Sequence, residues 1–143
     1  MKNSIYMKNF LISLHKKLKA PADANLLPQN INIGDYSEIK SFIDFDERVT
    51  APLHGYKNAL DYWTQCSSKQ YLNNIKIPTL IINAKNDTFL GSKCYPYDIA
   101  RKSKYVSLET PQSGGHVGFV TFNKENLYWS EKRAFEFLKE VMS

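Results

Sequence analysis

The chain has 143 residues, 43% of them apolar and 13% aromatic, with 19 basic and 14 acidic side chains. This length suits one domain-sized unit and the composition supports a packed core, which excludes an intrinsically disordered chain. The net charge of +5 is spread along the chain apart from the basic run at residues 15–19. Basic residues that do not cluster with aromatics predict a solvated surface, and we expect no nucleic-acid binding.

The cellular compartment is predicted from the absence of a membrane span, a signal peptide and a disulfide framework in the sequence. No run of about 18 apolar residues occurs, so we expect no membrane span. The apolar segment at residues 10–12 is too short for a signal peptide, and no small-residue cleavage site follows it. Cys66 and Cys94 are too few for a disulfide framework and are predicted to be partly buried free thiols. Together these features predict a cytoplasmic protein.

The first half of the chain is predicted to consist of helices and loops. Apolar residues recur at mostly three- and four-residue steps in residues 1–19, which predicts a helix with one packing face. These residues are Ile5, Phe10, Leu11, Leu14 and Leu18. His15 lies on the same basic helix and is expected at the surface. Prolines and a glycine in residues 20–34 predict a loop or lid connection.

Two short helices are predicted after this loop. Asp35 is expected to cap the first helix, with Glu38 as its capping-box partner. Pro52 is expected to interrupt the helical pattern at residues 50–55. The second helix is predicted over residues 56–65 from its apolar spacing.

The second half of the chain predicts strand–helix units. The dense β-branched run at residues 79–82 predicts a strand buried on both faces, as in a parallel sheet. A short helix at residues 93–101, a strand at 105–108 and a final helix at 127–141 follow. The final helix is expected to bury the face that carries Ala134, Phe137, Leu138 and Val141. The predicted fold class is therefore α/β, with parallel strands flanked by helices.

Asp87 and His116 each follow one of the two predicted strands. Ligand chemistry in parallel sheets takes place at the carboxyl ends of the strands, and one strand–helix–strand passage spans the interval between these residues. An acid followed by a histidine is also the order in which serine hydrolases with such sheets carry these two groups. We therefore predict that Asp87 orients the imidazole of His116, and that His116 is a general base.

Gly114 and Gly115 are predicted to form a tight turn that projects the side chain of His116 over the sheet edge, because glycine tolerates positive φ. Gly118 is expected to free the chain after the histidine. The alternative is a plain surface turn with an ordinary loop histidine, and a Gly-Gly-His sequence by itself does not separate the two. The order and spacing relative to Asp87 favour the catalytic interpretation.

Several segments resemble the α/β-hydrolase superfamily and, within it, the branch of YheT-like medium-chain ester hydrolases. Residues 77–87 are similar to the strand and acid loop of the superfamily. Residues 113–119, Ser-Gly-Gly-His-Val-Gly-Phe, resemble the histidine loop of that branch, and residues 45–56 resemble a segment before its last strands. Trp129 and Arg133 in the final helix match as well.

The resemblance extends over about residues 36–140 and implies the C-terminal part of an α/β-hydrolase fold. It implies cap-derived helices and loops in residues 1–71, and the last strand–helix units of the hydrolase domain in residues 72–143. It further implies a carboxylic-ester hydrolase with a serine mechanism and short or medium acyl substrates. Asp87 would be the triad acid and His116 the base, with no metal and no organic cofactor.

The departure from this family concerns the nucleophile. The G-x-S-x-G motif that carries the family's serine occurs nowhere in the sequence. We therefore expect a C-terminal fragment of an ester hydrolase that is inactive alone. The alternative is a non-catalytic module that binds a protein partner or forms a homodimer through an unpaired sheet edge.

Other polar and aromatic residues are given structural interpretations. Ser67 and Ser68 fall in a predicted loop and are not expected to replace the missing nucleophile. His54 is predicted to cap a turn, with a place in an acyl pocket as the alternative. Phe89 is expected in the core, with a pocket wall as the alternative. The acidic cluster at residues 44–47 lacks further ligands at suitable spacing, so no metal site is expected.

Overall fold

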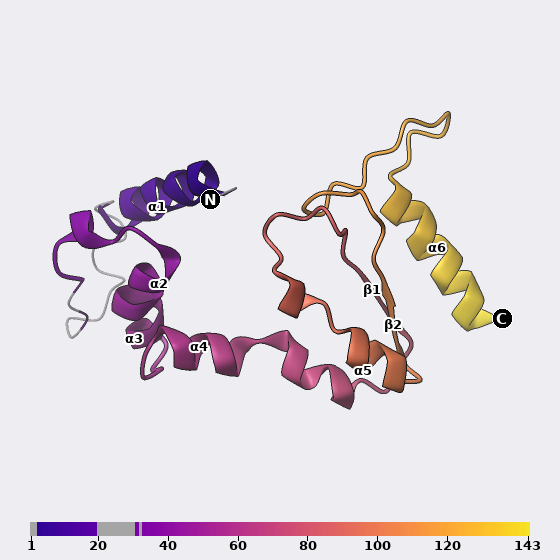
Figure 1. Cartoon of the computed structure of the whole chain (residues 1–143), viewed down its shortest axis with the longest axis horizontal. Coiled ribbons are helices and arrows are strands. Elements are labelled where there is room, and N and C mark those ends of the chain that lie inside the picture. The colour runs from indigo at the N-terminus through magenta and orange to yellow at the C-terminus, as the bar shows by residue number, and fades with distance from the viewer. Residues whose placement is uncertain (1–2, 20–30, 32) are drawn as a thin grey trace. The chain divides into compact units, whose positions relative to one another are not determined.

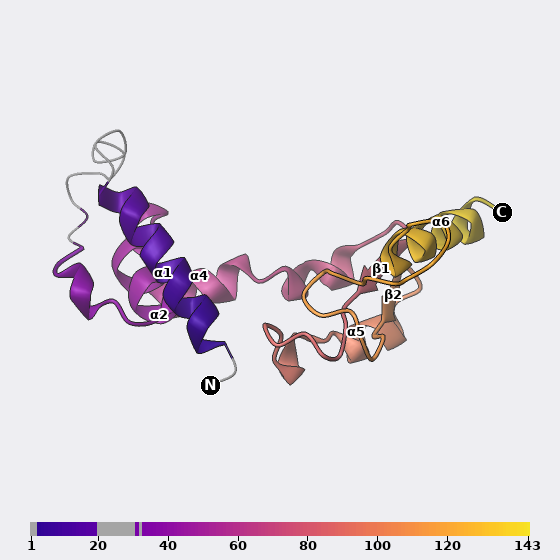
Figure 2. The ribbon, with the colours of Figure 1, turned by 90° about the horizontal axis from the view of Figure 1, so that it is seen from above.

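The structure is a computed structural model that describes residues 3–19, 31 and 33–143. It divides into two compact units, Met1–Ser67 and Ser68–Ser143, each considered by itself below. The elements of both are labelled in Figure 1 and seen from above in Figure 2. In the described part of the chain, no helix is long and apolar enough to cross a membrane.

The first unit contains helices and connecting loops in its described residues. Its elements are α1 (Ser4–Lys19), the 3-10 helix η1 (Tyr36–Glu38), α2 (Phe42–Phe45), the π-helix η2 (Asp46–Thr50), α3 (Ala51–Leu53) and α4 (Ala59–Cys66). The helix predicted at residues 1–19 is confirmed by α1, and the one predicted at residues 56–65 begins later, at α4. Most of the loop predicted at residues 20–34 lies outside the described residues.

Polar side chains fix the starts of η1 and α4 in this unit. Asp35 accepts a hydrogen bond from the Ser37 N–H at 2.8 Å, which confirms the predicted cap. The hydrogen bond from the Ser37 hydroxyl, and then the one from this N–H, lower the pKa of the Asp35 carboxyl. The predicted capping-box role of Glu38 is wrong, because its carboxylate pairs with Arg48 at 2.8 Å instead. Asn58 caps α4 by accepting from the Asp61 N–H at 2.8 Å.

The predicted interruption at residues 50–55 is wrong in its first part, because α2, η2 and α3 follow one another without a break and end only at Leu53. The π turn explains how the chain accommodates Pro52. In this turn the Ala51 N–H donates to the Asp46 carbonyl five residues back, so the helix changes its hydrogen-bonding pattern just before the residue that lacks an N–H.

The core of the first unit joins α1 to the segment that follows the undescribed residues. Its buried residues are Leu11, Ile39, Phe45 and Val49, with Met7, Leu14 and Leu18 packed against them. The expected surface position of His15 is wrong. Its ring is half-buried and stacks on Tyr36, with ring centroids 3.8 Å apart. Tyr36 also donates its hydroxyl to the Leu11 carbonyl at 2.9 Å, which ties this segment to α1.

The second unit contains the parallel sheet. Its elements are the 3-10 helix η3 (Ser68–Asn74), β1 (Thr79–Ile82), the 3-10 helix η4 (Ser92–Cys94), α5 (Tyr97–Lys102), β2 (Val106–Glu109) and α6 (Trp129–Met142). β1 pairs with β2 in parallel, from Thr79 opposite Val106 to Ile82 opposite Glu109. The predicted parallel pairing is therefore confirmed. The predicted burial of β1 on both faces is wrong, since all four of its residues are half-buried beside a single neighbouring strand.

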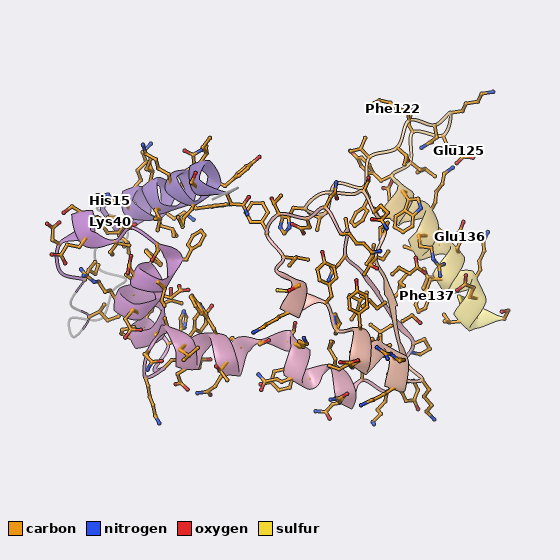
Figure 3. All side chains as sticks on the ribbon, in the orientation of Figure 1. His15, Lys40, Phe122, Glu125, Glu136 and Phe137 are labelled. Carbon is orange, nitrogen blue, oxygen red and sulfur yellow. The ribbon has the colours of Figure 1, made fainter. Side chains whose placement is uncertain are left out.

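The predicted burial of one face of α6 is also wrong. Leu138 is 51% exposed and Val141 is 42% exposed, while Phe137, labelled in Figure 3, is half-buried. A 14-residue helix is about 21 Å long, whereas strands of four residues are about 13 Å long. Strands β1 and β2 are therefore too short to cover the whole apolar face of the helix.

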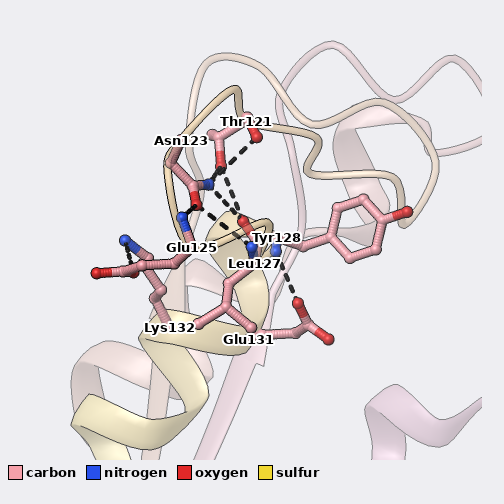
Figure 4. Close-up of polar contacts among 7 residues, drawn as sticks. All are labelled: Thr121, Asn123, Glu125, Leu127, Tyr128, Glu131 and Lys132. Carbon is pink, nitrogen blue, oxygen red and sulfur yellow. Dashed lines mark hydrogen bonds and ion pairs between the residues drawn. The ribbon is translucent and has the colours of Figure 1, made fainter.

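The loop before α6 is held by one asparagine, as Figure 4 shows. Asn123 donates from Nδ2 to the Leu127 carbonyl at 2.6 Å and accepts at Oδ1 from the Glu125 N–H at 3.0 Å. The Glu131 carboxylate then accepts from the Tyr128 N–H at 2.6 Å, where α6 begins. These contacts give α6 a defined first turn.

Replacing Asn123 by alanine should destabilise the second unit by about 1–2 kcal/mol, because several backbone groups of the loop lose their partner at once. Urea unfolding monitored by circular dichroism would measure this loss. The matched control is Lys124→Ala, an exposed neighbour, which should change stability by less than about 0.5 kcal/mol. Equal effects of the two substitutions would contradict the role of Asn123.

Candidate active site

The two loops that follow β1 and β2 run side by side at the carboxyl ends of the strands. The Asn83 N–H donates to the Glu109 carbonyl at 3.1 Å, and the Lys85 N–H donates to the Pro111 carbonyl at 2.8 Å. Backbone hydrogen bonding therefore continues past the last paired residues of the sheet. This continuation carries the chain before Asp87 alongside the chain that leads to His116.

Asp87 and His116 are brought together by these loops. His116 Nδ1 lies 2.9 Å from Asp87 Oδ2, a hydrogen-bonding distance. The Asp87 side chain is 5% exposed, whereas the His116 side chain is 54% exposed. The carboxylate is thus buried behind the imidazole, and the imidazole opens to solvent.

The hydrogen bonds of Asp87 indicate how protons are arranged in this pair. Its second oxygen, Oδ1, accepts from the Phe89 N–H at 2.8 Å. An ionised carboxylate only accepts hydrogen bonds, so His116 donates its Nδ1–H to it. In the neutral ring, Nε2 is then the unprotonated nitrogen, which can take up a proton.

A second hydrogen bond joins the same two loops one residue earlier in each. The Gly115 N–H donates to Asn86 Oδ1 at 2.8 Å, so the residues that precede the acid and the histidine are also paired. Sequence reasoning missed Asn86. The available signal was the equal spacing, since positions 86 and 115 are as far apart as positions 87 and 116.

Two aromatic side chains surround the pair. The ring of Phe89 lies 4.7 Å from the ring of His116 and is 40% exposed, so it borders the site and is not part of the core. Tyr95 donates its hydroxyl to the Ala84 carbonyl at 2.7 Å and supports the end of β1. Desolvation, and then the negative charge of Asp87, raise the pKa of Tyr95, so this hydroxyl stays protonated at neutral pH.

The turn that carries His116 is tighter than the sequence suggested. Gly115 adopts φ +58°, as predicted for this turn, but Gly118 does not need positive φ. Val117 and Phe119 take φ +55° and +47° in its place. Positive φ is strained for a β-branched residue such as valine. Strain of this kind persists only where the surrounding contacts hold it, and functional sites are one place where it is found.

The remaining predicted residues lie outside this pair. His54 is an exposed residue that caps the end of α3, in agreement with the turn interpretation. Ser67 and Ser68 are exposed. Both cysteines are exposed free thiols, which corrects their expected partial burial. Among the described residues, no group of histidine, cysteine and acidic side chains could hold a metal ion.

Replacing Asn86 by alanine should speed hydrogen exchange at the Gly115 amide by about fivefold, because a net hydrogen bond of roughly 1 kcal/mol is lost. Asn86→Asp keeps an acceptor and should retain most of the protection. Lys85→Ala alters only an exposed side chain in the same loop and is the matched control. Equal exchange rates of the Gly115 amide in all three variants, measured by NMR, would contradict the role of the Asn86 hydrogen bond.

The chain was compared with known proteins. It is 36% identical over 115 residues to an Escherichia coli (strain K12) protein named "Putative esterase YheT", which covers 80% of this chain and 33% of the relative. It is 33% identical over 96 residues to mouse phospholipase ABHD3, covering 67% of this chain and 23% of the relative. It is 32% identical over 120 residues to the Saccharomyces cerevisiae medium-chain fatty acid ethyl ester synthase/esterase 2, covering 84% of this chain and 26% of the relative.

These matches define the relationship and its extent. No family model and no solved structure matches the chain. The chain spans about a third or less of the length of these curated relatives. The matched part includes most of this chain, and its parallel strands and helices agree with a C-terminal α/β-hydrolase portion. The chain therefore belongs to the α/β-hydrolase superfamily, among relatives that are esterases and lipases by name.

Proposed function

We propose that this chain supplies the acid and the general base of a serine-dependent carboxylic-ester hydrolase. Asp87 is the acid and His116 is the base. The observation that carries the proposal is the 2.9 Å contact between His116 Nδ1 and Asp87 Oδ2, in which the His116 side chain is 54% exposed. The relationship to named esterases and lipases supports the same chemistry.

The proposed mechanism follows from the proton arrangement of the pair. His116 Nε2 takes the proton of a serine hydroxyl as that oxygen attacks the ester carbonyl. Asp87 stabilises the imidazolium that forms, and Nε2 then gives the proton to the departing alcohol. A water molecule, activated by the same nitrogen, releases the acid from the acyl-enzyme. Each step uses Nε2 of His116 and the buried carboxylate of Asp87.

We further propose that the acyl groups are short or medium in length. The yeast relative is named for medium-chain fatty acid ethyl esters, which supports this substrate class. In this proposal, residues 1–71 form cap-derived helices and loops, and residues 72–143 form the last strand–helix units of the hydrolase domain. Competition between ethyl esters of different chain length in an active protein would test the substrate class.

We propose that these 143 residues alone do not turn over esters, because they contain no G-x-S-x-G nucleophile. A base without its nucleophile cannot form an acyl-enzyme, so little catalysis should remain. The test is labelling by a fluorophosphonate probe together with release of p-nitrophenol from its octanoate ester. Stoichiometric labelling of a serine in this chain would overturn the proposal, and His116→Ala would then show whether that serine depends on the pair.

The second candidate function is a non-catalytic module that self-associates as a homodimer. The supporting observation is that, in the described residues, β1 and β2 pair only with each other, so each strand has one unpaired edge. Such edges favour pairing with another chain. Light scattering after size exclusion at several concentrations would test this, and a monomer at every concentration would count against it.

A further inference from the structure

A groove in the first unit, away from the acid–base pair in sequence, has the features of a small-molecule site. It has a volume of about 800 Å³, within the range of ligand pockets. One wall is α1 and the other is the segment of residues 34–40. Figure 3 labels His15 and Lys40, which come from these two walls.

The floor of the groove is apolar and is part of the core. Met7, Leu11, Ile12 and Ile39 line it, and Leu11 and Ile39 are only 8% and 5% exposed. Leu11 and Ile39 belong to the core with Met7 packed against them, whereas Ile12 is 44% exposed and offers apolar surface to a ligand. Extended apolar surface of this kind favours an aliphatic chain over a polar ligand.

Two ammonium groups line the walls of the groove. Lys8 comes from α1 and Lys40 from the opposite segment, and neither has an ion-pair partner in the described part of the chain. The lining also includes one carboxylate, Asp35, whose two oxygens are taken by the N–H and the hydroxyl of Ser37 at 2.8 and 2.7 Å. Asp35 keeps its negative charge, but the two lysines outnumber it, so the charged lining of the groove favours an anion.

His15, which also lines the groove, carries a buried polar atom without a hydrogen-bond partner in the described residues. Its Nε2 is the buried side-chain nitrogen that lacks a hydrogen-bond partner within the described residues. Buried polar atoms without a partner are rare in folded proteins, and a bound water, ion or ligand can satisfy them. The stacking of the His15 ring on Tyr36 fixes the position of this histidine, which is one of the residues that line the groove.

We propose that this groove binds an aliphatic carboxylate, with the chain on the apolar floor and the carboxylate between Lys8 and Lys40. The groove and the acid–base pair belong to different units of the chain, and the proposal does not rest on the proposed hydrolase function. It would hold a free fatty acid whether or not the chain takes part in ester hydrolysis.

The test is an NMR titration of the full 15N-labelled chain with decanoate below its micelle-forming concentration. Amide shifts should be confined to residues 4–15 and 34–40. Each added methylene from octanoate to dodecanoate should lower Kd by up to about fourfold, as expected for progressive burial of the chain. Decyltrimethylammonium has the same chain with a positive head group and should bind at least about tenfold more weakly.

Matched variants separate the groove from the rest of α1. Lys8→Gln combined with Lys40→Gln should raise the Kd for decanoate by about five- to tenfold, whereas Lys16→Gln combined with Lys17→Gln should leave it within about twofold. Both pairs change the net charge equally, and the amide spectrum reports whether each variant is folded.

A second matched pair tests the floor, because Ile12 lines the groove and Ile5, 74% exposed on the same helix, does not. Ile12→Ser should weaken binding several-fold, and Ile5→Ser should not. Three results would overturn the proposal. They are equal effects of the two members of either matched pair, equal affinity for decanoate and decyltrimethylammonium, and binding to anionic lipid vesicles without binding to dissolved decanoate. His116→Ala should leave the affinity unchanged, so a failed hydrolase assignment and a failed groove assignment give different results.

Discussion

Replacing His116 by alanine is expected to lower kcat at least about a thousandfold in a chimera in which this chain replaces the matching segment of the Escherichia coli relative. The family resemblance implies that the rest of this relative carries the nucleophile that these 143 residues lack. Asp87→Asn should cause a loss of similar order, because asparagine can donate to Nδ1 and so stabilise the wrong tautomer of the histidine. Hydrolysis of p-nitrophenyl octanoate measures both losses.

The double variant, His116→Ala with Asp87→Asn, tests whether the two residues act together. Because Asp87 acts through His116, combining the two substitutions should cost little more than His116→Ala alone. His54→Ala and Asp98→Asn change an exposed histidine and an exposed aspartate elsewhere and should leave kcat within about twofold. Multiplicative losses in the double variant would show that the two residues act independently, against the contact seen at 2.9 Å.

Replacing Gly114 by alanine is expected to destabilise the second unit by about 1–3 kcal/mol, the cost of overpacking. A Cβ at this position would lie 2.4 Å from Phe119 Cδ1 and 2.8 Å from the Ala84 Cβ. Both neighbours are buried, with 7% and 1% of their surface exposed, so neither can move away freely. The turn that holds His116 would have to shift.

Fluorescence during urea unfolding would measure this effect. Trp129 lies against Phe119, with ring centroids 5.7 Å apart, and a Trp63→Phe background leaves it as the single tryptophan. Gly91→Ala is the matched control, because its added Cβ meets no atom within 4 Å and its φ is −76°. The control should stay within about 0.5 kcal/mol of the parent. A Gly114 variant as stable as the control would show that the turn can relax.

Several secondary-structure elements could be predicted from the residue pattern of the segment that forms them. The strand at residues 79–82 and the parallel pairing were predictable, because a dense β-branched run between turn residues has few other solutions. Helix ends were less accurate where the chain used a device with no simple sequence signal. The π turn at residues 46–50 is such a device, and it carries the helix through Pro52.

Burial was the property that sequence periodicity predicted least well. The face of α6 with Leu138 and Val141 has the spacing of a buried helix, yet it is largely exposed in this chain. Periodicity records which residues are suited to burial, whereas burial itself needs a neighbouring surface of sufficient length. His15 shows the opposite case, since a basic helix predicted exposure and Tyr36 covers its ring.

The sequence by itself determined the α/β class, the parallel pair of strands and the identity of Asp87 and His116 as candidates. These depend on residue order and on spacing along the chain, which are fixed by covalent connectivity. Only the tertiary structure decided that the two side chains meet and that Asn86 pairs with Gly115 beside them. It also decided which glycine is crowded and where the groove beside α1 lies. Such features depend on distances between segments remote in sequence, and packing sets those distances.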